Sequence, residues 1–493
     1  MSCGRKAPTS SSLVTDARQT PADQPARDRA LKVDQSFIVQ APAGSGKTSL
    51  LVERYLHLLT QVAQPEEILA ITFTRAAAAE MRQRVLEELR KPTPLTEIIR
   101  DRDKAQNWRL NQNPQRMKIQ TIDSFATELA TQIPGSQSAE GMRIEEQPAP
   151  LYTQAAQNVL GRLFSDDPGR LFVGEFLSAL DNNAATAERV LSSMLAKRDQ
   201  WLDVTGLITS MALNDGAAIP QTLERAITEL RQEIMSTVTV ALSPHDSEMI
   251  HTLASKTDRQ ANLEALLPLI LTQGGTIRKT IDRRQGEVFG DKAFKSQVVE
   301  WFDELREREL EGLLQTCAML PDLGEDSTTI VATGVTLALA AAELETLLQR
   351  RQTIDFTGML MRASQGLRDD DGPTDLALYW DYKIKHLLVD EFQDTSRSQY
   401  KFFCLLTEGW SVEEGHTFFA VGDPMQSIYR FRDADVSIFS QCWEDGLPNV
   451  RLQPIRLQAN FRSSRALVEW NNDLFERLFP QSALPKLGAI PFS

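Results

Sequence analysis

Short apolar runs recur along this chain, and each passes through a few small or polar residues into a stretch whose apolar positions have helical spacing. Such runs, rich in β-branched and aromatic residues, are typical of strands buried on both faces. They lie at Phe37–Gln40, Ile68–Thr74, Ile119–Phe125 (a strand-to-helix junction), Leu387–Val389 and Thr417–Val421. Buried strands that alternate with helices predict an α/β fold with a parallel sheet.

The segment Ser36–Thr48 places a glycine-containing turn between a predicted strand and a predicted helix. Two glycines, Gly44 and Gly46, let several backbone N–H groups point into one concavity, to which the helix adds the positive end of its dipole. In such a loop Lys47 reaches the β- and γ-phosphates of ATP, and the Thr48 hydroxyl ligates Mg²⁺. A glycine turn before an ordinary helix is the alternative, which the strand–loop–helix order disfavours.

We therefore expect ATP to be bound by the loop and the start of the helix: Ala41, Pro42, Ala43, Gly44, Ser45, Gly46, Lys47 and Thr48. The motif normally opens with glycine, and this chain has Ala41 in that position.

Two adjacent carboxylates, Asp390 and Glu391, follow the apolar run that ends at Val389. Side chains alternate along a strand, so successive acids point in different directions and can take different roles. We assign Asp390 to Mg²⁺ and Glu391 to the general base that polarises the attacking water. An Asp-Glu pair alone is common, whereas the pair combined with a phosphate-binding loop is specific.

The run at 417–421 ends in a Gly-Asp-Pro turn, after which Gln426 is a candidate sensor of the γ-phosphate. Phe431 follows between two arginines, as in proteins that stack the bases of single-stranded nucleic acid. Further along, Arg462 is a candidate arginine finger for the γ-phosphate. Upstream, Gln24 could read an adenine edge, or it could be a surface residue of a short helix.

Candidate DNA contacts lie where the second and third predicted strands end. Phe73, Thr74 and Arg75 combine an aromatic face, a hydroxyl and a cation. The alternatives are that Phe73 belongs to the core and that Thr74 caps the next helix. The hydroxyls of Thr121 and Ser124 could contact the phosphate backbone, or they could only cap the helix that follows.

Composition leaves a nucleic-acid partner open. The 493-residue chain carries a net charge of −14, yet 75–118 holds 11 basic and 6 acidic residues. An acidic protein can therefore still line one groove with positive charge. The four cysteines are scattered without metal-ligand spacing, no apolar stretch has the length of a membrane span, and the polar N-terminus has no secretory signal. These features predict a cytoplasmic protein without a membrane partner.

The domain organisation follows from the spacing of the motifs. Residues 1–20 are expected to be disordered, and 21–135 to form the first part of the nucleotide-binding domain. The segment 136–350 reads as a helical insertion, 351–455 as the second part of that domain, and 456–493 as the start of a further, truncated domain.

Taken together, the motifs resemble those of superfamily 1 UvrD/Rep DNA helicases, most closely the AddA/RecB branch of double-strand-break repair helicase-nucleases. The resemblance rests on AlaGlySerGlyLysThr, IleThrPheThrArgAlaAlaAla, ThrIleAspSerPhe, LeuValAspGluPheGlnAspThr, ValGlyAspProMetGlnSerIleTyrArgPheArg and AsnPheArgSerSer, in the family's order. It implies a RecA-like P-loop core with a large helical insertion, use of ATP and Mg²⁺, and translocation from 3′ to 5′ on single-stranded DNA within a repair complex. The implied partners also include double-stranded DNA and a second nuclease subunit. By this resemblance, Lys47, Thr48, Asp390, Glu391, Gln426 and Arg462 are the ATP-site residues, Gln24 reads the adenine, and Phe73 and Phe431 stack bases.

The family's later helicase motifs and a nuclease motif do not occur in this sequence, so we expect the ATP- and DNA-binding half of such a helicase. Two other classes stay open: a P-loop ATPase that does not act on DNA, and a nucleotide-binding regulatory protein without turnover.

Overall fold

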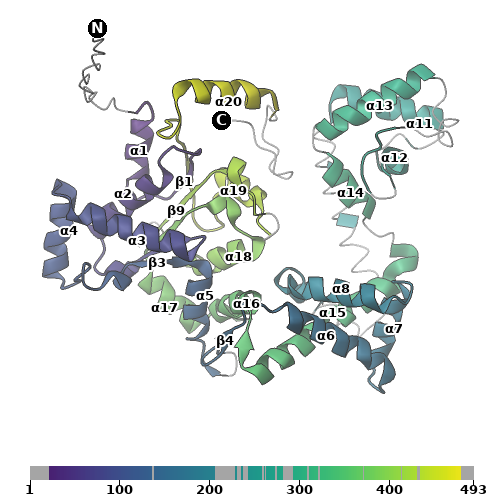
Figure 1. The fold of residues 1–493 in the computed structure, drawn as a ribbon, viewed down its shortest axis with the longest axis horizontal. Coiled ribbons are helices and arrows are strands. Elements are labelled where there is room, and N and C mark those ends of the chain that lie inside the picture. Colours follow the sequence, from purple (N-terminus) through teal and green to yellow (C-terminus); the bar gives the residue numbers. More distant parts are fainter. Residues whose placement is uncertain are drawn as a thin grey trace, which may run out of the picture.

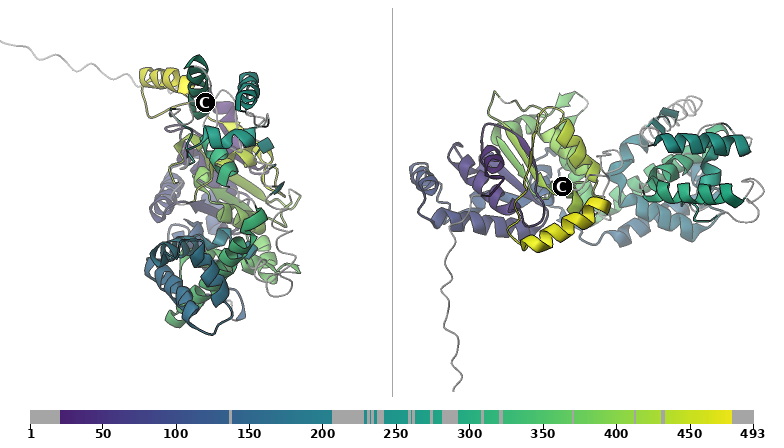
Figure 2. Two further views of the ribbon diagram at one scale, coloured as in Figure 1. Left: turned by 90° about the vertical axis from the view of Figure 1, so that its right-hand side faces the viewer. Right: turned by 90° about the horizontal axis from the view of Figure 1, so that it is seen from above.

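The computed structural model describes residues 21–478 except 136–137, 206–227, 230–231, 233–234, 237–241, 258–259, 261–262, 273–274, 281–291, 308–309, 320–322, 370, 412 and 430–432. The N-terminal segment expected to be disordered thus lies outside the described residues. The described chain is a mixed α/β structure in which a sheet-containing body and a group of helices lie side by side (Figures 1 and 2).

Six strands form the main sheet, in the order β10-β1-β9-β8-β2-β3, and every pairing is parallel. The strands are β1 (Phe37–Gln40), β2 (Ile68–Thr72), β3 (Lys118–Thr121), β8 (His386–Val389), β9 (Thr417–Gly422) and β10 (Gln453–Arg456). Two-stranded pairs elsewhere join β4 (Arg143–Ile144) to β5 (Thr353–Ile354) and β6 (Arg368–Asp369) to β7 (Gly372–Pro373).

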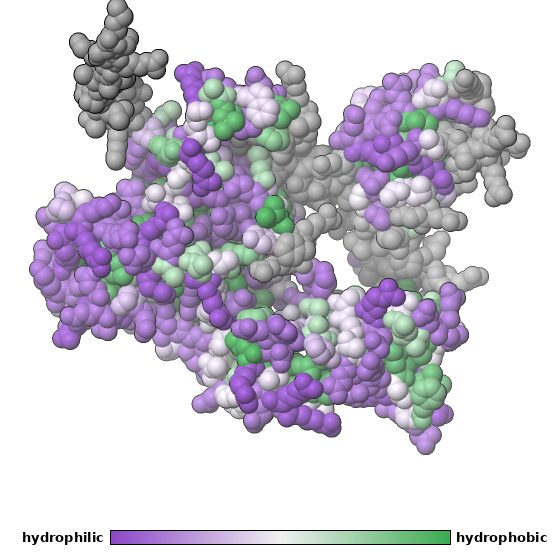
Figure 3. All heavy atoms as spheres, in the orientation of Figure 1, coloured by the Kyte–Doolittle hydropathy of each residue, from purple (hydrophilic) through white to green (hydrophobic). Residues whose placement is uncertain are grey.

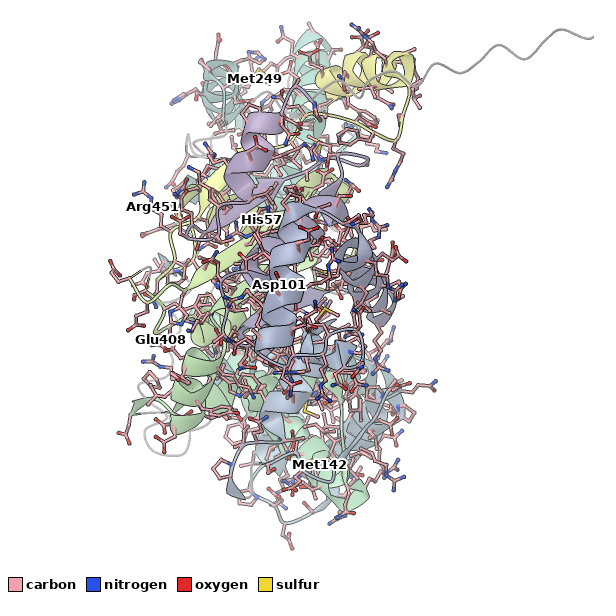
Figure 4. The ribbon with its side chains drawn as sticks, turned by 90° about the vertical axis from the view of Figure 1, so that its left-hand side faces the viewer. His57, Asp101, Met142, Met249, Glu408 and Arg451 are labelled. Atoms are coloured by element: carbon pink, nitrogen blue, oxygen red, sulfur yellow. The ribbon has the colours of Figure 1, made fainter. Side chains whose placement is uncertain are left out.

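Apolar residues cover both faces of the sheet, which explains the continuous apolar runs of the strands. In β1, Phe37 and Val39 join one hydrophobic cluster while Ile38 joins the other. The first cluster includes residues of α2 (Lys47–Leu59), α3 (Arg75–Arg90) and α4 (Pro94–Ala105), and Figure 4 views this side, with His57 of α2 and Asp101 of α4 labelled. The second includes residues of α5 (Ile122–Ala130), α16 (Phe356–Leu367), α17 (Asp375–Lys383), α18 (Arg397–Leu406) and α19 (Val436–Glu444).

Element boundaries follow the sequence pattern closely. β1 spans the residues expected for it, and α3 begins directly after Thr74. The second strand ends at Thr72 rather than Thr74, because the Thr74 side chain accepts a hydrogen bond from the Ala77 backbone N–H and caps α3. The RecA-like α/β core expected from the motifs is therefore confirmed.

The long insertion is helical, as expected. Its first group packs α6 (Ala149–Gly161), α7 (Arg170–Ser178) and α8 (Ala184–Leu195) against α15 (Leu323–Arg351). A second group, α11 (Pro244–Thr257), α12 (Leu263–Ile270), α13 (Lys292–Glu307) and α14 (Glu311–Met319), has its own hydrophobic cluster and lies apart from the sheet (Figure 1). The described chain also contains α1 (Gln24–Ala30) and α20 (Arg465–Leu478).

One helix corrects the expectation that no stretch has the length of a membrane span. The stretch Thr328–Arg351 of α15 is long and apolar enough to cross a membrane, judged by length and composition only. Half of its apolar window is buried inside the protein. Leu344 and Leu348 pack in the same cluster as α6, α7 and α8, so α15 reads as the core helix of the insertion. The expectation was wrong because a buried core helix can be as long and apolar as a membrane span.

Candidate nucleotide and DNA site

Six segments that carry the sequence motifs lie at one edge of the sheet. Each follows the carboxyl end of a strand, and the strands are parallel and in register there: Gln40 pairs with Gly422 and Arg456, and Ile71 pairs with Val389. The loops after β1, β2, β3, β8, β9 and β10 therefore share this edge, where open α/β sheets bind ligands. We call it the motif edge.

The loop after β1 has the backbone conformation that phosphate binding requires. Gly44 and Gly46 have φ values of +81° and +85°, in the left-handed region that favours glycine. α2 begins at Lys47, so its N-terminus opens onto the motif edge. The Ser45 hydroxyl is buried without a hydrogen-bond partner in the described part of the chain, an orphaned polar group of the kind that a bound phosphate satisfies.

The segment after β10 lies directly on this loop. A Cβ atom at Gly44 would come within 2.7 Å of the Arg462 Cβ and 2.8 Å of the Asn460 Oδ1. The Asn460 amide donates to the Ala43 carbonyl over 3.1 Å, and the Phe461 N–H donates to the Gly44 carbonyl over 2.8 Å. Arg462 is thus beside the phosphate-binding loop, and its side chain is exposed.

Lys47 and Glu391 form an ion pair across the motif edge, with 2.9 Å between Lys47 Nζ and Glu391 Oε2. Glu391 is in the left-handed region with φ of +50°, an uncommon backbone conformation for a residue with a side chain. The buried Gln393 amide also donates to Glu391 Oε2, over 2.9 Å. The carboxylate is therefore held towards the phosphate-binding loop.

Asp390 directly precedes Glu391 and is partly shielded from water. Burial raises the pKa of Asp390 to about 6, the negative charge of Glu391 adds to the rise, and Lys47 opposes it. Ionising a carboxylate beside a second negative charge costs free energy, and a bound cation lowers that cost. With the Thr48 hydroxyl lining the same cavity, these oxygen donors fit a Mg²⁺ ion.

That cavity has a volume of about 350 Å³. Its lining includes Thr48, Phe73, Asp390, Glu391, Gln426 and Tyr429. Residues from four motifs, far apart in the sequence, therefore share one space.

A hydrogen-bond network joins the loops after β8 and β9. Gln393 accepts a bond from the Asp423 backbone N–H over 2.9 Å, while the Gln426 amide donates to the Asp423 carboxylate. Gln393 also contacts Glu391, so Gln426 is connected to the proposed base through two residues. Sequence reasoning missed Gln393, although it lies within the quoted LeuValAspGluPheGlnAspThr motif.

A second feature that sequence reasoning missed is a clamp formed by the start of α1. Arg27 pairs with the buried Asp23 over 2.8 Å and donates to the Ser45 carbonyl over 2.8 Å. Asp23 accepts bonds from the backbone N–H groups of Gln458 and Ala459 over 2.7 and 3.0 Å. Burial alone would raise the pKa of Asp23, yet these donors lower it to about 2.

Gln24 lies between the two clamp residues but does not belong to the clamp. It is half-buried and donates to Asp28 over 2.7 Å. The signal that could have identified Asp23 and Arg27 is their i, i+4 spacing just upstream of the first strand.

The candidate DNA contacts at the ends of β2 and β9 differ in their surroundings. Phe73 is half-buried and lies against Tyr429, with 4.6 Å between ring centroids, so it lines the cavity rather than the core. Thr74 and Arg75 are exposed at the start of α3. Phe431 lies outside the described residues.

The hydroxyls after β3 form a cap. Thr121 accepts from the Ser124 backbone N–H over 3.2 Å, and the two hydroxyls are 2.9 Å apart. The capping alternative is therefore what the structure shows, while Ser124 remains partly exposed.

Comparison with known proteins agrees with this arrangement. The family model described as the UvrD/REP helicase N-terminal domain matches residues 23–445. Curated relatives that are named as the "A" member of an ATP-dependent helicase/nuclease include those of Bacillus pumilus (26% identical, over 92% of this chain and 40% of the relative), Moorella thermoacetica (28%, 97% and 36%) and Staphylococcus carnosus (25%, 91% and 38%). The chain thus spans about two fifths of the length of these relatives. Because the family model covers most of the chain and the motif edge carries its nucleotide-binding elements, the chain belongs to the UvrD/REP helicase N-terminal domain family.

Proposed function

We propose that this chain is the ATP-binding motor part of a DNA helicase that translocates from 3′ to 5′ on single-stranded DNA in double-strand-break repair. The observation that carries the proposal is the convergence of Lys47, Asp390, Glu391 and Gln426 at one edge of a parallel sheet, with Phe73 and Tyr429 in the same cavity. The family match and the names of the curated relatives support it.

In this proposal the loop 41–46 and the α2 N-terminus hold the phosphates of ATP, and Gln24 reads the adenine. Thr48 and Asp390 hold Mg²⁺, which when bound neutralises charge on the phosphates and orients them. The raised pKa of Asp390 reflects the cost of ionising it without a cation. Gln426 and Arg462 act on the γ-phosphate from the loops after β9 and β10.

The Lys47–Glu391 pair suggests how the site is switched on. With no phosphate present, Lys47 neutralises the base. When phosphates enter, the Lys47 ammonium turns to them, and the Glu391 carboxylate becomes free to accept the proton of the attacking water. Gln393 keeps Glu391 in place through the amide bond described above.

DNA is proposed to lie against the exposed ends of the loops after β2, β3 and β9. Phe73 and Phe431 offer stacking faces, Arg75 offers a cation, and Thr74, Thr121 and Ser124 offer hydroxyls. Since Phe73 contacts Tyr429, which follows the Gln426 loop, movement there on hydrolysis would reach the bound strand.

We further propose a cytoplasmic location and a second protein chain as partner. The names of the relatives describe each of them as one of the subunits of a helicase/nuclease, which indicates that those proteins work in an assembly. The domain limits given above are part of the same proposal, with 456–493 opening a second motor domain.

The test is steady-state ATP hydrolysis by the wild-type chain, Lys47→Ala and Glu391→Gln, together with ATP binding by each. Glu391→Gln should bind ATP and lose turnover by at least about 100-fold, because the base is lost while the phosphate contacts remain. Lys47→Ala should lose turnover while its affinity for single-stranded DNA persists. Undiminished turnover in Glu391→Gln would assign the base to another residue, and ATP binding by the wild type without any hydrolysis would favour a regulatory protein.

A further inference from the structure

A cluster of potential metal ligands lies outside the motif edge. Asp381 is in the last turns of α17, and Glu414 and His416 belong to the segment that leads into β9. His416 directly precedes the first residue of β9, so the cluster is at the end of that strand opposite to Gly422 and the motif edge. In Figure 1, α17 lies below the sheet while α20 lies above it.

The ligand atoms converge on one point. One nitrogen of His416 and one carboxylate oxygen each of Asp381 and Glu414 all lie within 4.8 Å of one another. The Nδ1 of His416 is 3.8 Å from Glu414 Oε2. Metal–ligand bonds of about 2 Å place ligand atoms no more than about 4 Å apart around one ion, so only a small closure is needed.

The tautomer of the neutral ring is set by its other nitrogen. His416 Nε2 is 3.2 Å from the Asp381 backbone carbonyl. A carbonyl can only accept, so Nε2 carries the proton and a neutral ring presents a free lone pair at Nδ1. Histidine ligands of metals are oriented in this way by a carbonyl or carboxylate on the opposite nitrogen.

This lone pair is buried and has no hydrogen-bond partner in the described part of the chain. The His416 side chain is 6% exposed, and both its Nδ1 and one Asp381 oxygen, Oδ1, lack such a partner there. Trp410 stacks on the ring with 5.1 Å between centroids and 13° between planes, which fixes its orientation. An orphaned buried acceptor of this kind needs an explanation, such as a missing ion.

The charges around the cluster also favour a bound cation. Two carboxylates, those of Asp381 and Glu414, lie close together here. The two lysines that flank the end of α17 are engaged elsewhere: Lys383 lies over the Trp380 and Tyr379 rings, and Lys385 pairs with Glu67. Three potential ligands therefore face one another, and neither of these two lysines is paired with them.

We propose that Asp381, Glu414 and His416 bind one divalent transition-metal ion of the zinc class. One imidazole nitrogen and two carboxylate oxygens suit Zn²⁺ better than Mg²⁺, which prefers oxygen ligands alone, and water completes the coordination. The ion clips the end of α17 to the segment before β9. This site is independent of the proposed nucleotide site and takes no part in hydrolysis.

The test is calorimetric titration of the nucleotide-free, chelator-treated chain with Zn²⁺ alone, with Mg²⁺ as the comparison ion. We expect one Zn²⁺ per chain and a higher melting temperature in its presence, because an ion that binds only the folded state stabilises it. Glu414→Gln is the main variant, since this side chain is 64% exposed and its replacement should not disturb folding. It should weaken Zn²⁺ binding at least tenfold, and Asp381→Asn should do the same.

Two controls separate this site from others. Asp390→Asn, which alters the proposed Mg²⁺ site, and His57→Gln, which removes another histidine, should both keep Zn²⁺ binding unchanged. Binding of equal strength in wild type and Glu414→Gln would overturn the proposal. Absence of Zn²⁺ binding by the folded wild type would also overturn it.

Discussion

Asp390 shows how a neighbouring residue changes the ionisation of a side chain in the site. Its carboxylate is half-buried beside a second acid, and its pKa rises to about 6. The unfolded value is near 3.8, so the folded chain loses stability as the pH rises from about 4 through about 6. A functional site can tolerate this loss of stability because the cation that it binds offsets the cost of ionising the carboxylate.

Asp390→Asn should therefore stabilise the nucleotide-free chain at pH 7.5 by about 3 kcal/mol, at 1.4 kcal/mol for each unit of the rise in pKa from 3.8 to about 6. The amide keeps an oxygen to accept the Glu391 backbone N–H but carries no charge. Urea unfolding of wild type and variant at pH 4.5 and pH 7.5 measures the effect, which should fall to about a third at the lower pH. Glu87→Gln, at an exposed position of α3, is the control. A pH-independent difference would contradict the raised pKa.

The next scale is that of the elements, where the α1 clamp connects a short helix to two motif loops. Asp23 and Arg27 together hold the Ser45 carbonyl and the backbone of 458–459. The lowered pKa of Asp23 means that this contribution to stability is complete above about pH 4 and is lost as the pH falls towards 2. α1 thus connects the phosphate-binding loop to the segment after β10.

Asp23→Ala should lower the free energy of unfolding by about 1–3 kcal/mol, the cost of leaving buried donors without an acceptor. It should also weaken ATP binding, since Arg27 loses the partner that aims it at the Ser45 carbonyl. Chemical unfolding and titration with an ATP analogue measure the two effects. Glu87→Ala changes an exposed acid of α3, outside the clamp, and should do neither; equal effects of the two substitutions would exclude a special role for the clamp.

Local pattern predicted five of the six strands of the main sheet and the motif positions, because a strand buried on both faces leaves a continuous apolar run and a phosphate-binding loop needs glycine at defined positions. It missed the edge strand β10, which buries only one of its four residues and so leaves no such run. It did not predict what depends on tertiary contacts. The Asp23–Gln458 bond joins residues near the two ends of the described chain, and no sequence spacing indicates it. The Phe73–Tyr429 contact likewise depends on strand order, as does the pairing of Lys47 with Glu391.

At the scale of the whole molecule, a buried joint connects the sheet-containing body to the helical insertion. Arg198 of the insertion donates to Asp355 over 2.8 Å, and Tyr152 of α6 donates to the same carboxylate. Asp355 is 1% exposed and also caps α16 through the Gly358 N–H. Burial would raise the pKa of Asp355, yet these donors hold it below its usual value.

Asp355→Ala should destabilise the chain by about 3–5 kcal/mol, because it leaves the Arg198 charge buried without a partner. The expected result is an earlier urea transition, and limited proteolysis should show preferred cleavage near the joint. Tyr152→Phe, which removes one donor and no charge, should cost less. Equal losses from both substitutions would mean that packing rather than charge holds the two bodies together.

Apolar side chains are exposed at a few places on the surface of the molecule. The face in Figure 3 is mostly hydrophilic, with apolar patches over α20 and α7. On α20, Leu467, Trp470 and Leu474 are 48%, 61% and 40% exposed, and their spacing places them on one side of the helix.

The most direct test of a DNA motor is the affinity of Glu391→Gln for Mg·ATP with and without a single-stranded oligonucleotide, followed with a fluorescent ATP analogue. The variant is expected to bind without turning over, so equilibrium is reached. Because the proposed nucleotide and DNA residues meet at the motif edge, DNA should change the ATP affinity by at least about fivefold, and ATP should change the DNA affinity by the same factor. Unchanged ATP affinity at saturating DNA, or failure to bind DNA at all, would contradict a DNA motor and leave an ATP-binding protein of another kind.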